Sequence, residues 1–231
     1  MLNAIIFDVN DTLTFSTWKN GLDDFILACL NEYSKIDPTE FRKINTKIKK
    51  NISKKDKKDK YYSDWMTFTI NEYSDYLGLN LDVKEKTRIL NKIDHYITEN
   101  THTLTGTYKL LERLHNDYPL YVITNSSKRV RKALKKLKLD KFFKDIFISE
   151  ESGRIKENGE IFKDFIQTTK LDPNKCLMIG DKLKSDGKCK TVGMLFCLVD
   201  KDNKSQMGDY DFKVNSIDEV YSVINKLNKL V

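Results

Sequence analysis

Short apolar runs alternate with helical stripes along most of the chain, and this alternation predicts the fold. The runs, such as residues 4–7, are too short for helices and rich in β-branched and large apolar residues, which is typical of strands buried on both faces. We expect strands at residues 4–7, 120–123, 145–149, 176–179, 194–199 and 211–214. Apolar spacings of three to four residues predict helices at 108–115, 130–137, 159–168 and 217–230. Strands alternating with helices indicate an α/β fold with a doubly wound parallel sheet.

Residues 16–99 interrupt this alternation with four amphipathic helical stripes, and we expect no strand in residues 16–100. The stripes begin near Trp18, Pro38, Tyr62 and Asp82. Asp37 before Pro38 has the pattern of a helix N-cap followed by a proline at the first helical position. The sequence therefore predicts a core domain of residues 1–15 and 100–231, into which an all-helical domain of residues 16–99 is inserted.

Composition narrows the class of protein. The chain has 231 residues, of which 39% are hydrophobic and 32% charged, values typical of a globular protein and not of a disordered one. Its longest apolar runs are far too short to cross a bilayer, and its start lacks the pattern of a signal peptide. The four cysteines form no CxxC pair. We therefore expect a reduced, cytoplasmic protein without a membrane partner.

The net charge of +7 raises the question of nucleic-acid binding. Basic and acidic residues are interspersed along the whole chain, and even the densest basic run, residues 49–60, places Asp56 and Asp59 among seven lysines. Such runs are usually solvated loops or helix faces. We therefore expect no nucleic-acid partner.

Acidic residues follow the apolar runs at residues 4–7 and 176–179. Asp8 comes directly after residues 4–7, and Asp181 follows the run that ends at Gly180, with Asp186 five residues later. Parallel strands bring such ends to one edge of a sheet, where ligands of open α/β folds bind. Converging carboxylates raise one another's pKa unless a cation neutralises them. Oxygen-only ligands of this type suit Mg²⁺.

Neutral and basic polar residues accompany these acids. Thr124 and Asn125 end the strand at residues 120–123, and Lys156 precedes the helix expected at residues 159–168. A lysine, a threonine hydroxyl and backbone amides are the groups that phosphoryl oxygens require. These residues are therefore candidates for phosphate binding.

At these positions the sequence resembles the haloacid dehalogenase-like (HAD) superfamily. The stretch from Asp8 to Leu13, DVNDTL, resembles its first motif, and Thr124-Asn125 resembles the second. Lys156, within GRIKENGEIF, resembles the third, and GDKLKSD at residues 180–186 resembles the fourth. The motifs occur in order, and the resemblance spans the whole chain, including a helical cap inserted after the first motif. It implies a Rossmann-like core domain with a helical cap.

The resemblance also implies a mechanism. Asp8 would be a carboxylate nucleophile that attacks phosphorus and forms an aspartyl-phosphate. Mg²⁺ would be held by Asp8, the backbone carbonyl of Asn10 and Asp181, with Asp186 orienting this set of ligands. The implied enzyme is a Mg²⁺-dependent phosphohydrolase.

The substrate implied by the resemblance is a small phosphorylated metabolite, whose transferring phosphoryl group Thr124 and Lys156 would bind. The helical cap is expected to gate the site on hinges at residues 14–17 and 99–104. Substrate choice would then depend on cap residues such as Trp18 and the helix at residues 37–50.

The first motif departs from the family pattern at two positions. Family phosphatases usually carry an aspartate two residues after the nucleophile, as general acid and base, and this chain has Asn10 there. An amide donates a hydrogen bond but cannot transfer a proton. Asp11 stands where the family usually has glycine, and it is not expected to substitute, because adjacent residues of an extended segment point in opposite directions.

Asn10 leaves two alternatives open. A metal-independent 2-haloacid dehalogenase, in which Asp8 attacks carbon, also lacks the second aspartate, but it has no need of the acidic pair in GDKLKSD. A non-catalytic ligand-binding or regulatory protein would keep the fold without turnover. The phosphohydrolase is the preferred interpretation, because a complete fourth motif is where a metal ion would bind.

Overall fold

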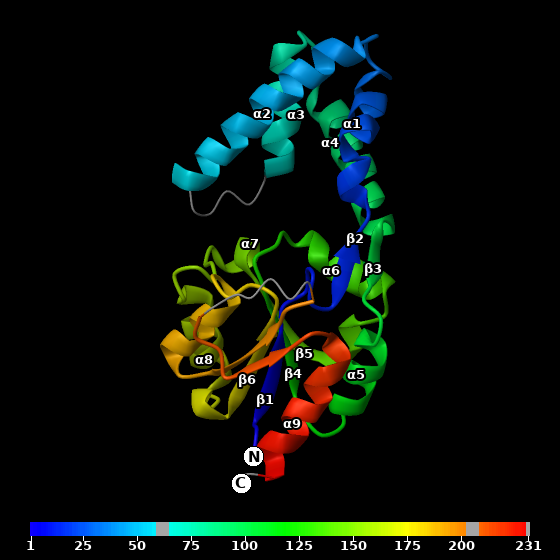
Figure 1. Ribbon diagram of the computed structural model, residues 1–231. Helices are drawn as coiled ribbons and strands as arrows, with labels where there is room; N and C mark the ends of the chain where they lie inside the picture. The colour runs from blue at the N-terminus through cyan, green and yellow to red at the C-terminus, as the bar shows by residue number, and fades with distance from the viewer. Residues whose placement is uncertain (59–64, 202–207, 230–231) are drawn as a thin grey trace. The chain divides into compact units, whose positions relative to one another are not determined.

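The computed structural model describes residues 1–58, 65–201 and 208–229 (Figure 1). The chain divides into two compact units, one formed by Met1–Phe15 and His102–Val231 and the other by Ser16–Thr101. We call them the core unit and the helical unit. Across the described residues, no helix is both long and apolar enough to cross a membrane.

The core unit contains a six-stranded, wholly parallel sheet in the order β5-β4-β1-β6-β7-β8. Its strands are β1 (Ala4–Phe7), β4 (Leu120–Thr124), β5 (Phe143–Ile148), β6 (Cys176–Gly180), β7 (Leu195–Val199) and β8 (Phe212–Val214). The chain proceeds from β1 to one edge of the sheet and then returns to build the other half. The strand order therefore reverses next to β1, and this is the position where open α/β sheets bind ligands. The predicted doubly wound sheet is confirmed.

Successive residues of each central strand enter different hydrophobic cores. Ile5 and Phe7 of β1 belong to one core, and Ala4 and Ile6 belong to the other. Helices α5 (Thr107–Leu114), α6 (Arg129–Lys136) and α9 (Val220–Lys229) pack in the first core, whereas α8 (Glu160–Thr169) and the 3₁₀ helix η4 (Asp186–Val192) pack in the second. Figure 1 shows α5 and α9 on one side of the sheet and α8 on the other. Burial on both faces explains why the strands read as continuous apolar runs.

The remaining elements of the core unit are short. They are the helix α7 (Ser149–Ser152) and the 3₁₀ helices η2 (Asp140–Phe142), η3 (Pro173–Lys175) and η5 (Ile217–Glu219). The expected strands and helices begin and end within two residues of the observed ones, with one exception at the last helix. That helix starts at Val220 because η5 forms its first turn, and the expected end at residue 230 lies outside the described residues. The short helix α7 was not expected.

The helical unit packs its helices around an apolar core of its own. Its helices are η1 (Trp18–Asn20), α1 (Leu22–Leu30), α2 (Pro38–Lys58), α3 (Trp65–Tyr76) and α4 (Val83–Glu99). The expected cap before Pro38 is confirmed, because Asp37 Oδ1 accepts hydrogen bonds from the backbone N–H groups of Thr39 and Glu40 at 2.9 and 3.0 Å. A reciprocal capping box between Asp82 and Glu85 begins α4.

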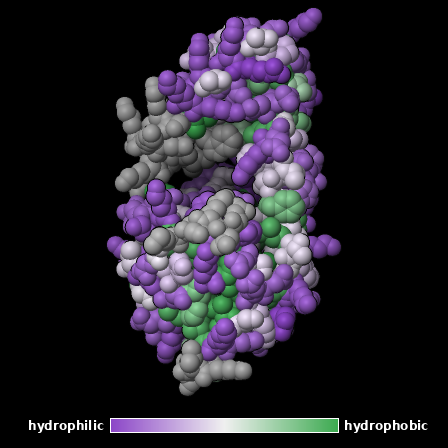
Figure 2. Space-filling view, viewed as in Figure 1, coloured by the Kyte–Doolittle hydropathy of each residue, from purple (hydrophilic) through white to green (hydrophobic). Residues whose placement is uncertain are grey.

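Polar side chains dominate one visible face of these helices. Most side chains of the helical unit on the face drawn in Figure 2 are hydrophilic. Helix α2 continues through Lys58, so most of the basic run at residues 49–60 is helical, and residues 59 and 60 lie outside the described part of the chain, as does Tyr62.

Two short strands were not expected. Strand β2 (Thr14–Ser16) pairs with β3 (Thr101–Thr103), and of these residues Ser16 alone falls in the interval 16–100 in which no strand was expected. Each strand has only three residues, and their threonines and serine show no apolar alternation that a sequence pattern could reveal. Both boundaries between the units fall inside these strands.

Phe165 of α8 tests the packing of the second core. Its side chain is fully buried and makes edge contacts with Tyr121 and Phe147, at centroid distances of 5.1 and 5.2 Å. We expect Phe165→Ala to lower the free energy of unfolding by about 3–5 kcal/mol, because the cavity cannot fully collapse. The exposed Gln167 of the same helix is the control, and Gln167→Ala is expected to change stability by less than about 0.5 kcal/mol. Urea denaturation of both variants measures the difference, and equal midpoints would contradict this account.

Candidate active site

The ends of β1, β4 and β6 bring the first candidate residues together. Strand β1 pairs with β4 on one side and β6 on the other, with Phe7 opposite both Val122 and Ile179. Asp8 continues this ladder, because its backbone N–H donates to the carbonyl of Ile179 at 2.9 Å. Asp8 therefore lies at the carboxyl edge of the sheet, between the strands that end in Thr124 and Gly180.

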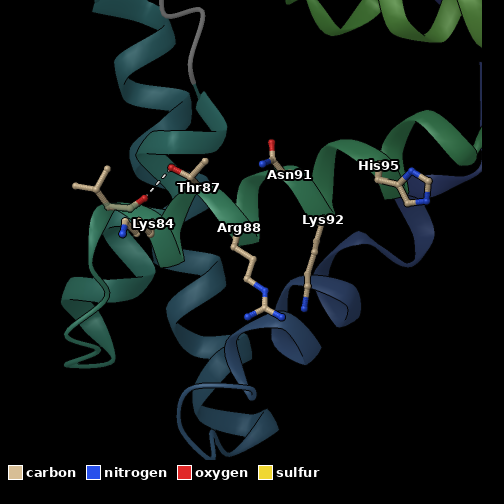
Figure 3. A pocket seen from close by; sticks show the side chains of 7 residues that line it. Lys84, Thr87, Arg88, Asn91, Lys92 and His95 are labelled. Atoms are coloured by element: carbon tan, nitrogen blue, oxygen red, sulfur yellow. Dashed lines mark hydrogen bonds between the residues drawn. The ribbon is translucent and has the colours of Figure 1, made fainter.

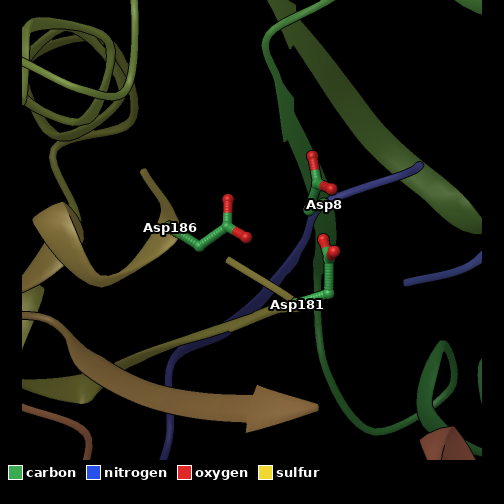
Figure 4. Close-up of side chains that lie close together, drawn as sticks. All are labelled: Asp8, Asp181 and Asp186. Carbon is green, nitrogen blue, oxygen red and sulfur yellow. The ribbon is translucent and has the colours of Figure 1, made fainter. Parts of the chain in front are cut away.

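Three carboxylates converge at this edge. One carboxylate oxygen from each of Asp8, Asp181 and Asp186 lies within 4.8 Å of the others. Figure 4 shows the three side chains close together, Asp8 from the segment after β1 and Asp181 and Asp186 from the segment after β6. Asp186 is placed by a tight turn, since its Oδ2 accepts the backbone N–H of Lys182 at 2.9 Å. A Cβ at Gly180 would lie 2.3 Å from the same oxygen, so this position has no room for a side chain.

Lys156 joins two of these carboxylates. Its Nζ donates to Asp8 Oδ1 at 2.6 Å and to Asp186 Oδ1 at 2.7 Å. The lysine side chain is only 2% exposed, and the Asp186 side chain 1%. A buried ion pair of this kind requires both partners, because removing one leaves an uncompensated charge away from water.

Burial and mutual repulsion shift the pKa values of these acids. Burial raises the pKa of Asp8, Asp186 raises it further, and Lys156 opposes the rise. Burial also raises the pKa of Asp181, and the charge of Asp8 adds to the effect. For Lys156, burial alone would lower the pKa, but Asp186 and Asp8 outweigh burial and raise it. An oxygen-only cluster in which carboxylates repel one another fits a hard divalent cation such as Mg²⁺.

The hydroxyl of Thr124 lies at the same edge and lacks a partner. The residue is fully buried, and none of the residues that the structure describes offers Thr124 Oγ1 a hydrogen bond. Buried polar groups are rarely left unsatisfied, and an orphan of this kind indicates a ligand or water. Its neighbour Asn125 is exposed and contacts the loop that carries Lys156.

Asn10 and Asp11 form the turn that follows Asp8. Asn10 is exposed, whereas Asp11 is partly buried and has a left-handed backbone with φ of +63°. The family's glycine is favoured at this position because it adopts that conformation without strain. The premise of an extended segment was therefore wrong for Asp11. The negative charge of Asp11 also raises the pKa of Asp181.

Other residues brace this turn. Thr12 is fully buried, and its Oγ1 lies 3.5 Å from Asp181 Oδ1. The ammonium of Lys201, which follows β7 and Asp200, donates to the backbone carbonyl of Asp11. Sequence reasoning missed Lys201, because nothing in the local pattern after β7 indicates a contact with the first motif.

A hollow of about 560 Å³ lies elsewhere, along α4 of the helical unit. It is lined by Val83, Lys84, Thr87, Arg88, Asn91, Lys92 and His95. Figure 3 shows Arg88 and Lys92 extending from the same side of the helix, and Lys92 pairs with Glu32 at 2.5 Å. None of the seven predicted site residues lines this hollow, which is a basic helix face and not part of the strand-end site.

The ion pairs of Lys156 give a stability prediction. Lys156→Met would leave Asp8 and Asp186 buried without their shared cation, so we expect the free energy of unfolding to fall by about 3–5 kcal/mol in EDTA. Lys188→Met provides the control, because Lys188 is exposed and lies in η4, as Asp186 does. Urea denaturation measures both. A loss below about 1 kcal/mol for Lys156→Met would show that the ion pairs do not stabilise the fold.

Comparison with protein families identifies a match over most of the chain. The family model described as haloacid dehalogenase-like hydrolase matches residues 2–188. The region contains all seven predicted site residues, from Asp8 to Asp186.

Two curated relatives are similar in sequence. A HAD-hydrolase of Bacillus subtilis, YfnB, is 28% identical over 139 residues, which cover 58% of this chain and 59% of that protein. The glyceraldehyde 3-phosphate phosphatase of Methanocaldococcus jannaschii is 27% identical over 244 aligned residues, which cover 99% of this chain and all of that protein.

Solved structures share the fold. YfnB bound to magnesium superposes with a TM-score of 0.69 at 21% identity, over 97% of this chain and 99% of that one. A 2-haloacid dehalogenase from Pseudomonas syringae superposes with a TM-score of 0.75 at 16% identity, over 98% of this chain and all of that one. At such low identity these likenesses establish the architecture alone.

Proposed function

The chain belongs to the haloacid dehalogenase-like hydrolases, and from that premise we propose that it is a Mg²⁺-dependent phosphohydrolase of small phosphorylated metabolites. The observation that carries the proposal is the cluster of Asp8, Asp181 and Asp186, in which Asp8 and Asp186 are buried and Lys156 lies between them. The phosphatase among its full-length relatives supports the same class of reaction.

We propose that Asp8, Asp181 and the backbone carbonyl of Asn10 hold the metal ion, and that Asp186 orients them. Asp186 suits this role because Lys156 and the backbone of Lys182 fix its two oxygens. When bound, Mg²⁺ neutralises negative charge on the phosphoryl oxygens.

The phosphoryl group would bind to donors that lie at this edge of the sheet. Thr124 ends β4, the strand beside β1, and its buried Oγ1 has no hydrogen-bond partner among the described residues. Lys156 brings a buried ammonium 2.6 Å from the carboxylate that would attack. Positioning and charge neutralisation supply most of the catalysis in phosphoryl transfer.

Asp8 would act as nucleophile in the first step. One of its carboxylate oxygens bonds to phosphorus, while the bond to the leaving oxygen breaks and its electron pair stays on that oxygen. Water then attacks the aspartyl-phosphate, releasing inorganic phosphate and regenerating Asp8. Because Asn10 cannot supply a proton, the leaving oxygen must take one from water. We infer that substrates with good leaving groups, such as acyl phosphates, react best.

Asn10 is also compatible with a second candidate function, a metal-independent dehalogenase in which Asp8 attacks carbon. Halide release from a 2-haloacid that EDTA does not affect would establish it. The position of both Asp181 and Asp186 beside Asp8 argues against it, because a metal-free reaction has no need of this acidic pair. A binding protein without turnover is the third candidate, which tight phosphate binding without multiple turnover would identify.

The helical unit is proposed to act as the cap that gates this site, with hinges at residues 14–17 and 99–104. Trp18 and residues 37–50, which form the cap and first part of α2, are the proposed sources of substrate selectivity.

Removal of the nucleophile or of the metal tests the proposal directly. We expect wild-type protein to release phosphate from members of a phosphometabolite and acyl-phosphate panel with Mg²⁺, and Asp8→Asn to fall to the background rate. EDTA should abolish wild-type release, and excess Mg²⁺ should restore it. Asp140→Asn is the control, because Asp140 is exposed and belongs to η2. A wild type that remains silent on the whole panel, with intact folding, would refute the phosphohydrolase.

The identity of residue 10 should determine how strongly kcat depends on the leaving group of the substrate. We expect Asn10→Asp to raise kcat for alkyl phosphates by about 10²-fold, because it supplies the missing general acid. Acyl phosphates need no proton on the leaving group, and for them the change should be within about threefold. Steady-state kinetics on the two substrate classes measure the contrast. Equal effects on both classes would mean that residue 10 has a role other than proton transfer.

A further inference from the structure

We propose that Glu157 is a positioning residue for the reaction, which acts through Asn125 on Lys156. This inference rests on the proposed function. Asn125 Nδ2 donates to Glu157 Oε2 at 2.6 Å, and Asn125 Oδ1 accepts the backbone N–H of Lys156 at 3.0 Å. The side-chain amide thus links two consecutive residues of the loop between α7 and α8.

The two contacts select the same orientation of the Asn125 amide. A carboxylate can only accept a hydrogen bond, so it requires the NH₂ group of the amide, and the N–H of Lys156 requires the carbonyl oxygen. A flipped amide would oppose oxygen to oxygen and N–H to N–H. Glu157 therefore fixes the amide in the orientation that holds the backbone of Lys156.

Both the backbone and the side chain of Lys156 are held by hydrogen bonds. Its N–H is bound by Asn125, and its carbonyl accepts the N–H of Gly159 at 2.9 Å. Its Nζ reaches Asp8 and Asp186. A shift of the loop would thus move the ammonium relative to the nucleophile, and catalysis is sensitive to displacements of this kind.

Glu157 itself has little structural value. It is exposed, and within the described chain Asn125 is the side chain that it contacts by hydrogen bond. Exposed contacts of this kind add little to global stability. Glu157 is thus placed to affect the position of Lys156 without holding up the fold.

Four variants of the full chain test whether Glu157 acts on Lys156 through Asn125. They are Glu157→Ala, Glu157→Gln, Asn125→Ala and the double alanine variant. We expect Glu157→Ala to lower kcat/KM about tenfold, mainly through kcat, because the ammonium matters most for charge that develops in the transition state. Glu157→Gln keeps an acceptor oxygen for Asn125, and the Lys156 N–H still selects the carbonyl oxygen of the Asn125 amide, so this variant should stay within about threefold of wild type. The double variant should equal Asn125→Ala, since Glu157 would act only through that amide.

Glu112→Ala is the matched control, because Glu112 is an exposed glutamate of α5. It is expected to keep the wild-type kcat and KM. All single variants except Asn125→Ala should unfold at the wild-type urea midpoint, which separates positioning from loss of structure.

Inorganic phosphate supplies a readout that needs no turnover. Calorimetric titration with Mg²⁺ present should show weaker phosphate binding by Glu157→Ala, by about threefold or more, and near wild-type binding by Glu157→Gln. If the wild type hydrolyses nothing, the proposed function fails, and this titration still decides the role of Glu157. Equal changes in the alanine and glutamine variants, additive effects in the double variant, or absence of phosphate binding by the wild type would each overturn the inference.

Discussion

The buried contact of Lys156 with Asp8 and Asp186 is the constraint on which the rest of the core unit depends. Taking three ionised groups out of water is costly, and the cost is offset only when their geometry is good and their other polar atoms are also bound. Both ion pairs span long stretches of sequence, with Lys156 coming from the loop before α8. The sheet, the helices and three separate loops must therefore be in place together before the charges are compensated.

The sheet meets this constraint through its strand order. With β1 at the centre, the first motif lies between the strands that supply Thr124 and Asp181, and the reversal of order beside β1 leaves room for ligands. Gly180 then allows Asp186 to fold back over the end of β6, where a Cβ would collide with its carboxylate. The same parallel pairing that buries the apolar side chains of β1, β4 and β6 also aligns their carboxyl ends, where Asp8, Thr124 and Asp181 lie.

The sequence reveals the parts of this site that follow regular patterns. Asp8, Thr124 and Asp181 each end a continuous apolar run, so the pairing of parallel strands suffices to predict that they meet. Contacts made by loops follow no repeating sequence pattern, and the contacts of Glu157 and Lys201 were missed for that reason. The backbone of Asp11 was wrongly expected to be extended, because its left-handed turn is a local conformation that neither spacing nor hydropathy reports.

The balance of charge favours a metal-assisted reaction over a metal-free one. Lys156 lies between Asp8 and Asp186, and the more exposed ammonium of Lys182 lies 3.7 Å from Asp181. Even with these two cations, burial and mutual repulsion raise the pKa of Asp8 and Asp181. A phosphoryl group and a haloacid are both anions, so either would be repelled from this edge. A divalent cation among these oxygens would offset the repulsion. The cluster therefore suits a phosphate that arrives with Mg²⁺ better than it suits an anionic substrate alone.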